Sequence, residues 1–319
     1  MRKSIVASAG AAFGLSFEEK ALLASPAKPA KPVPAGSTEG LPTGKIGNLR
    51  ISRLICGGNL ISGFAHSRDL IYVSSLIKQY FTDEKVIETL QIAEENGINS
   101  AILRLDDYCI RILRKYWKLK SRRLQWIAQI RPKEDDLKTD AKRAIDNGAV
   151  GVYIQGGVGD KFTRIGRVDL LGKTVEFIKE NGVIAGIGAH SLDVPVAVEK
   201  AGIEPDFYMK TLHSGNYWSA KRPDQHQTVA DNPADNYWSV TPQKTIEFMK
   251  EVDRPWIAFK VLAAGAIHPR DGFAYAFNNG ADFICVGMFD FQVREDVIIA
   301  KDILSRISRM KSCNRNKIY

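Results

Sequence analysis

The stretch LLGKTVEFIKENGVIAGIG, residues 170–188, decides the fold. Its first half has apolar side chains at helical spacing and ends at Asn181 and Gly182, which are typical of a helix C-terminus. Its second half, Val183–Gly188, is a short and almost continuous apolar run, as expected for a strand of a parallel sheet that is buried on both faces. The stretch therefore predicts one helix–turn–strand unit of an α/β fold.

The same unit recurs along the chain. The expected strands are Ser52–Cys56, Ser100–Leu105, Gln125–Ile130, Gly151–Gln155, Val183–Gly188, Asp206–Leu212, Trp256–Leu262 and Asp282–Val286. The expected helices are Asp83–Asn96, Tyr108–Lys120, Leu137–Asn147, Leu170–Asn181, Val194–Ala201, Thr241–Glu251, Arg270–Asn279 and Arg294–Ile307. Eight strands that alternate with helices predict a single (β/α)8 TIM barrel. An open doubly wound sheet is the alternative, and the lack of a GxGxxG motif after the first strand disfavours it.

We expect the barrel to span residues 44–308, between an N-terminal segment of 1–43 and a basic tail of 309–319. Arg2 and Lys3 precede the apolar run IVASAGAAFGL, as in a secretory signal peptide, and PAKPAKPVPAG then predicts an extended linker. The segment predicts an exported or periplasmic protein. A disordered arm on a cytoplasmic protein is the alternative.

The composition is that of an ordinary globular chain, with 45% hydrophobic and 25% charged residues. No apolar run reaches the roughly 18 residues of a membrane-spanning helix, so we expect no integral membrane segment. The net charge of +9 is partly concentrated in Arg111–Arg123, which lacks a nucleic-acid-binding motif and is interpreted as a solvated helix face. The four cysteines form no CxxC pair, and we expect free thiols.

Two lysines within apolar strands are the most unusual candidates for catalysis. Alternation along the strands places Lys210 with Tyr208 and Lys260 with Ala258, and we expect both amines to point into the barrel interior. Burial would lower the pKa of such an amine and allow a Schiff base or general-base chemistry. The alternative is that each lysine forms an ion pair with an acidic residue near the barrel mouth, or points between strands and helices.

Because active sites of such barrels lie at the C-terminal ends of the strands, further polar residues become candidates there. His190 and His213 follow neighbouring strands and are expected to bind substrate through hydrogen bonds in preference to a metal, since no metal-ligand motif surrounds them. Arg104 and Arg131 suit a carboxylate or phosphate of the substrate, or form ion pairs. The remaining candidates for substrate binding are Asn59, Asp106, Gln155 and Trp218, the last in an aromatic loop, 214–240, that predicts a lid.

Three segments resemble the aldo-keto reductase superfamily. They are GKIGNLRISRLICGGN from Gly44, DEKVIETLQIAEENGIN from Asp83 and VGMFDFQVREDVIIAKDIL from Val286. The resemblance implies a nicotinamide cofactor, NAD or NADP, near Gly265, Gly287 and Met288. Most of the family's catalytic tetrad has no counterpart here, because Ile102 stands near the position of its Asp and Gln129 or Arg131 at that of its Lys. Gln155 replaces its His, and Tyr108 is the only candidate for its proton donor.

The sequence thus supports three hypotheses for a protein that acts on a small molecule. The leading one is a divergent aldo-keto-reductase-like enzyme, an NAD(P)-dependent oxidoreductase of a small polar or sugar-like carbonyl compound. The second is an aldolase-like lyase or isomerase that uses an interior lysine with His190 and His213. The third is an exported, non-catalytic sugar-binding barrel.

Overall fold

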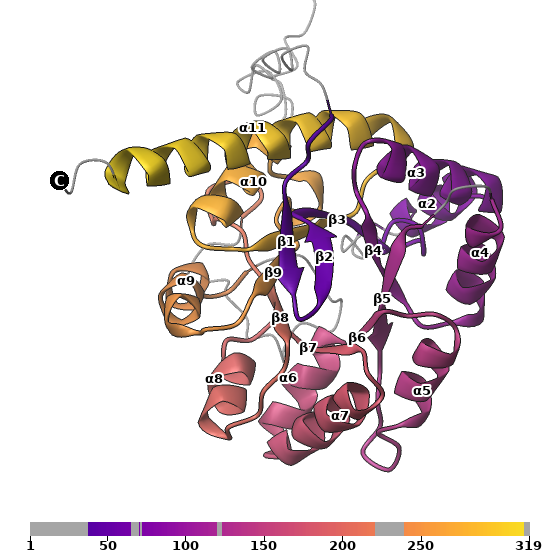
Figure 1. Cartoon of the computed structure of the whole chain (residues 1–319), viewed down its shortest axis with the longest axis vertical. Helices are drawn as coiled ribbons and strands as arrows, with labels where there is room; N and C mark the ends of the chain where they lie inside the picture. The colour runs from indigo at the N-terminus through magenta and orange to yellow at the C-terminus, as the bar shows by residue number, and fades with distance from the viewer. Residues whose placement is uncertain (1–37, 65–69, 71, 120–122, 221–238, 316–319) are drawn as a thin grey trace, which may run out of the picture. The chain divides into compact units, whose positions relative to one another are not determined.

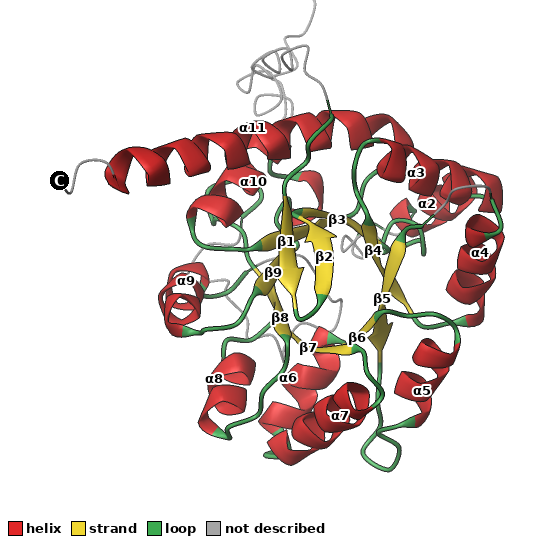
Figure 2. Ribbon diagram, viewed as in Figure 1, coloured by secondary structure: helices red, strands yellow, loops and turns green. Residues whose placement is uncertain are grey.

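Eight parallel strands form a closed barrel in the computed structural model of the chain, with helices around it (Figure 2). The structure describes residues 38–64, 70, 72–119, 123–220 and 239–315. The barrel strands, each paired with the next and the last with the first, are β3 (Leu54–Gly57), β4 (Ser100–Arg104), β5 (Gln125–Ile130), β6 (Gly151–Ile154), β7 (Ile184–Ala189), β8 (Phe207–Thr211), β9 (Trp256–Phe259) and β10 (Phe283–Val286). The predicted TIM barrel is confirmed.

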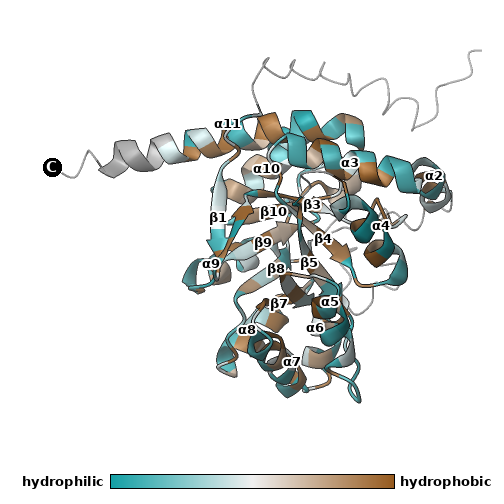
Figure 3. Cartoon of the chain, turned by 45° about the vertical axis from the view of Figure 1, so that its right-hand side comes forward, coloured by the Kyte–Doolittle hydropathy of each residue, from teal (hydrophilic) through white to brown (hydrophobic). Residues whose placement is uncertain are grey.

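The helices form an outer layer around the strands (Figure 1). They are α2 (Val73–Tyr80), α3 (Asp83–Glu95), α4 (Asp107–Trp117), α5 (Thr139–Asp146), α6 (Gly156–Arg164), α7 (Val168–Glu180), α8 (Asp193–Lys200), α9 (Pro242–Glu251), α10 (Pro269–Asn278) and α11 (Asp290–Arg315). Hydrophobic colour in Figure 3 is concentrated on the strands, whereas the helices alternate between hydrophobic and hydrophilic residues, as amphipathic helices do.

An antiparallel hairpin that the sequence analysis did not predict precedes the barrel. Its strands are β1 (Thr43–Ile46) and β2 (Leu49–Ser52). A two-residue turn that begins at Gly47 joins them, and the φ of +55° at Gly47 is the positive value that such tight hairpin turns require. Ser52 therefore ends the hairpin, and the first barrel strand begins at Leu54. Ile46 and Ile51 are fully buried in one cluster with side chains from the barrel interior, so the hairpin closes the N-terminal end of the barrel.

Phe207 fills part of this interior because Gly186, its pairing partner on β7, has no side chain. A Cβ atom at position 186 would lie 2.3 Å from the Phe207 ring. The glycine-rich run at 184–189 thus serves packing, since it makes room for an aromatic residue on the neighbouring strand.

Two other features differ from the sequence-based expectations, and three predicted segments cannot be compared. Helices α2 and α6 lie in segments where no helix was expected. Helix α11 begins at Asp290 and continues to Arg315, so most of the expected basic tail is helical. The predicted signal-like segment up to residue 37, residues 221–238 of the aromatic loop and the last four residues lie outside the described part of the chain.

None of the described helices is both long enough and apolar enough to cross a membrane.

Replacing Ile51 by Ala tests the role of the hairpin. The substitution leaves a cavity at the closed end of the barrel and should lower the free energy of unfolding by about 3 kcal/mol, measured by urea denaturation. Val196→Ala, at a residue on α8 that is 40% exposed, is the control and should cost less than about 0.5 kcal/mol. Equal effects of the two substitutions would show that the hairpin does not belong to the cooperative barrel core.

Candidate active site

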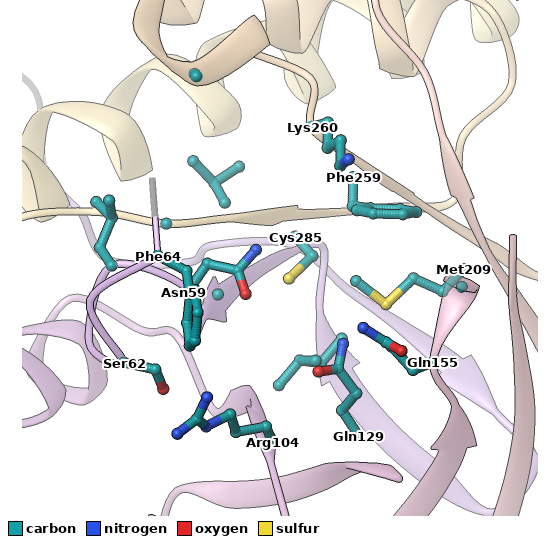
Figure 4. A pocket seen from close by; sticks show the side chains of 18 of the residues that line it. Asn59, Ser62, Phe64, Arg104, Gln129, Gln155, Met209, Phe259, Lys260 and Cys285 are labelled. Atoms are coloured by element: carbon teal, nitrogen blue, oxygen red, sulfur yellow. The ribbon is translucent and has the colours of Figure 1, made fainter. Parts of the chain in front are cut away.

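A cavity of about 770 Å³ lies at the C-terminal ends of the barrel strands, and all eight strands or the residues directly after them contribute to its lining. Its floor is formed by Ile102, Tyr153, Met209, Phe259 and Cys285. Figure 4 shows Asn59, Ser62, Phe64 and Arg104 on one side and Gln129, Gln155, Met209, Phe259 and Lys260 on the other, with Cys285 between them. This position is the one at which TIM barrels place their chemistry.

The most organised polar group in the cavity is the pair formed by His190 and Asp160. The Nδ1 atom of His190 lies 2.7 Å from an Asp160 carboxylate oxygen, and the carboxylate also accepts hydrogen bonds from the backbone N–H groups of His190 and Ser191. Since a carboxylate only accepts, Nδ1 carries the proton, and in the neutral imidazole Nε2 carries the lone pair. Burial of Asp160, which is 9% exposed, fixes the imidazole in this tautomer.

Glycines allow α6 to bring Asp160 to this position. The helix starts directly after β6 with the sequence GGVGD and packs against β7. A Cβ atom at Gly159 would lie 2.3 Å from the Gly188 carbonyl oxygen, and one at Gly156 would lie 3.0 Å from Cε1 of His190. The close approach of α6 to the end of β7 therefore depends on residues without side chains.

Lys210 lies behind this pair and not in the cavity. It is 2% exposed, and its Nζ donates hydrogen bonds to the carbonyl oxygens of His190 (2.7 Å) and Thr211 (3.2 Å). Burial lowers the pKa of Lys210 to about 8, Asp160 opposes this shift, and Lys260 adds to it. The expected orientation into the barrel interior is wrong, because Met209 takes the inner face of β8 and Lys210 shares the outer face with Tyr208.

Lys260 does line the cavity, although strand alternation does not bring it there. It follows the last residue of β9 with a φ of +59°, and Ala263 and Ala264 have φ values of +45° and +56°. Such conformations cost non-glycine residues of the order of 1–3 kcal/mol each and are concentrated at functional sites. The amides of Leu262 and Ala264, which both line the cavity, donate no hydrogen bond to any described residue.

Four other predicted substrate-binding residues line the same cavity: Asn59, Asp106, Arg131 and Gln155. So does Arg104, which stacks on Phe64 with 4.9 Å between the guanidinium carbon and the ring centroid and pairs with Asp106. The carboxylate of Asp106 also caps α4 by accepting from the Cys109 amide. For Arg131, the described part of the chain contains no ion pair with its guanidinium group.

The remaining predicted residues are divided between the cavity and other places. Gly265 and Gly287 line the cavity, whereas Met288 is buried in the core between the barrel and its helices. His213 is buried, its Nδ1 lies 2.9 Å from the Ser214 carbonyl oxygen, and it does not line the cavity. Trp218 is 90% exposed outside the lining. Tyr108 lies on α4 under Arg111, and burial raises the pKa of its hydroxyl.

Sequence reasoning missed several members of the site. Asp160 falls in the unpredicted helix α6, and only the GGVGD run marks it. Tyr153 was also missed; it accepts a hydrogen bond of 2.6 Å on the cavity floor from Gln129, which the sequence analysis had named, and burial raises the pKa of the Tyr153 hydroxyl. Cys285 contributes a thiol there, and burial raises its pKa as well. Within the described ranges, no three His, Cys, Asp or Glu side chains are arranged to hold a metal ion.

Comparison of the sequence with protein-family models gives no match, and comparison with curated proteins gives none either. Solved structures do share the architecture. A protein described as an aldo-keto reductase from Pseudomonas aeruginosa superposes with a TM-score of 0.57 at 16% identity, over 85% of this chain and 98% of that one. A mutant of Gox0644 in complex with NADPH gives 0.54 at 11% identity, over 85% and 94%. The resemblance seen in the sequence thus extends to the whole barrel fold.

Lys210 predicts a specific pH dependence of stability. Its pKa is about 8 in the folded protein and near the ordinary 10.5 in the unfolded chain, so the unfolded state binds more protons between these values. The burial penalty is fully present below pH 8 and is relieved as the pH rises towards 10.5. Relative to Lys210→Met, the native protein should therefore gain about 3 kcal/mol of unfolding free energy between pH 7 and pH 10.5. Urea denaturation of both proteins measures the effect. If their unfolding free energies differ by the same amount at every pH in this range, the lowered pKa of Lys210 is wrong.

Proposed function

We propose that the protein is an aldo-keto-reductase-like oxidoreductase that binds a nicotinamide dinucleotide and acts on a carbonyl compound. One observation carries the proposal: His190, which Asp160 orients, and the loop from Lys260 to Gly265 border the same cavity at the C-terminal mouth of the barrel. The structural likeness to a protein described as an aldo-keto reductase and to Gox0644, solved with NADPH, supports it.

The residues around the cavity fit the phosphates of such a cofactor. The unpaired amides of Leu262 and Ala264 are donors for anionic oxygens, and the ammonium group of Lys260 supplies a positive charge beside them. The left-handed conformations of Lys260, Ala263 and Ala264 are explained if this loop must present its amides to a ligand. Gly265 and Gly287 leave room for close approach to the backbone. A bound nicotinamide would supply the hydride for carbonyl reduction.

His190 replaces the missing tyrosine as the group that moves a proton. The protonated imidazole can donate from Nε2 to the oxygen of a carbonyl being reduced, because Asp160 holds Nδ1 and stabilises the positive charge. Tyr153 is a weaker candidate, since burial raises the pKa of its hydroxyl more than the hydrogen bond from Gln129 lowers it. The backbone hydrogen bonds to Asp160 hold the carboxylate in place, and the carboxylate orients the imidazole.

A lyase that forms a Schiff base on Lys210 is less well supported. Lys210 does not line the cavity, so its amine does not meet a substrate carbonyl there, whereas Lys260 does line it. Lys260 and His190 retain the geometry for general-base chemistry, and this remains the competing hypothesis if no nucleotide binds.

Titration of the protein with NADPH and with NADH, followed by nicotinamide fluorescence, tests cofactor binding. Lys260→Asn removes the charge but keeps a residue that tolerates positive φ, and should weaken nucleotide binding about tenfold. Lys142→Asn, on the outer surface of α5, is the matched control and should leave binding unchanged. If neither nucleotide binds at high micromolar concentration, the reductase proposal is wrong.

His190→Gln separates the proton-transfer role from binding. The variant should bind nucleotide as the native protein does, yet reduce a carbonyl substrate about 10²–10⁴ times more slowly, since the remaining amide cannot transfer a proton. Steady-state kinetics with a panel of aldehydes and ketones measures the effect. An unchanged kcat in the variant would remove His190 from the mechanism.

A further inference from the structure

The side of the cavity formed by α2 differs in character from the side formed by β7 and β9. On the latter side lie His190, Lys260 and Gln155, which are polar or charged. The α2 side is lined by apolar side chains from three segments: Leu60, Phe64, Val73, Leu76, Ile77 and Phe289. Asn59, Ser62 and Arg104 lie on the same side as Phe64 (Figure 4), so the apolar wall is the part that α2 and Phe289 form.

The apolar lining continues outside the cavity along α2. Tyr72, Leu76 and Tyr80 are four residues apart, so they lie on one stripe of the helix. They are 65%, 62% and 37% exposed, and Leu76 also lines the cavity. Single exposed apolar residues are common in proteins, but a stripe continuous with a cavity marks a binding surface.

Aromatic residues at the start of α11 extend this surface. The ring of Phe289 stacks on Phe81 and on Phe291, with centroid distances of 5.3 and 5.4 Å, and Tyr80 contacts it edge-on at 5.3 Å. Phe291 is 69% exposed. The arrangement leaves apolar side chains exposed to solvent. Helix α2, which carries several of them, has no acidic residue and one lysine, Lys78.

We propose that the substrate of this site carries an apolar arm, an aromatic ring or an alkyl chain of several carbons, that lies against α2 while its carbonyl group faces His190. The inference rests on the proposed function for the carbonyl group, but the arm is assigned from the cavity alone. The stripe joins the cavity at Leu76, and Val73, Ile77 and Phe289 continue the apolar wall inside it, which selects a ligand arm over a second protein chain as the occupant. It also replaces the small polar or sugar-like compound that the sequence suggested.

Two ketones that differ only in the arm test the proposal. The dissociation constants of 4-phenyl-2-butanone and 2-butanone are measured by NMR, without nucleotide, so that binding is observed independently of any reduction. The native protein should bind the phenyl compound at least tenfold more tightly. Leu76→Ser should weaken its binding about tenfold and leave 2-butanone unchanged, and Val196→Ser, on an exposed helix position away from the cavity, should affect neither.

The outcomes separate this inference from the reductase proposal. Equal affinity for the two ketones, or phenyl-compound binding that does not depend on Leu76, overturns the apolar arm. A concentration-dependent dimer that Leu76→Ser dissociates in sedimentation equilibrium also overturns it, because the stripe would then belong to a subunit contact. If the arm binds as expected but no nucleotide does, the arm stands and the reductase proposal fails.

Discussion

The interior of an eight-stranded barrel has to be filled by side chains, and this protein fills its two ends differently. At the N-terminal end the β1–β2 hairpin packs Ile46 and Ile51 into one buried cluster with Phe207 and Phe283. At the C-terminal end polar side chains such as Gln129, Gln155 and His190 line the cavity. The solid lower layer gives the site a fixed base, since residues such as Tyr153 and Met209 belong to both the packed interior and the cavity floor.

The polar part of the site depends on how closely α6 approaches β7. Asp160 can accept from two backbone amides and from His190 only because Gly156, Gly159 and Gly188 have no side chains to separate the two elements. Lys210 holds the same peptide from the other side through the His190 carbonyl oxygen. A buried carboxylate and a buried ammonium group on either side of one residue are costly to desolvate, and their mutual attraction offsets part of that cost.

The barrel could be predicted from the sequence because each buried strand shows itself as an apolar run bounded by glycine and an amphipathic helix. The hairpin could not, because TGKI and LRIS are short and alternate weakly. Lys210 was misplaced because alternation fixes only that Tyr208 and Lys210 share a face, and not which face is inner. Lys260 lines the cavity because its backbone has a positive φ, and the local sequence gives no sign of that conformation. Asp160 was missed because its partner, His190, is thirty residues away and meets it only through the close packing of α6.

The fold and the catalytic residues follow different constraints in this chain. A barrel tolerates replacement of polar residues at its mouth, because those side chains contribute little to the packed interior. Two barrels of the same fold can therefore catalyse different reactions. Two features of the site point to a ligand. A buried carboxylate orients one imidazole, and a loop in strained conformations has two amides that donate no hydrogen bond to any described residue. The left-handed conformations of the loop cost free energy, and a ligand that meets the imidazole and the loop amides together would offset that cost.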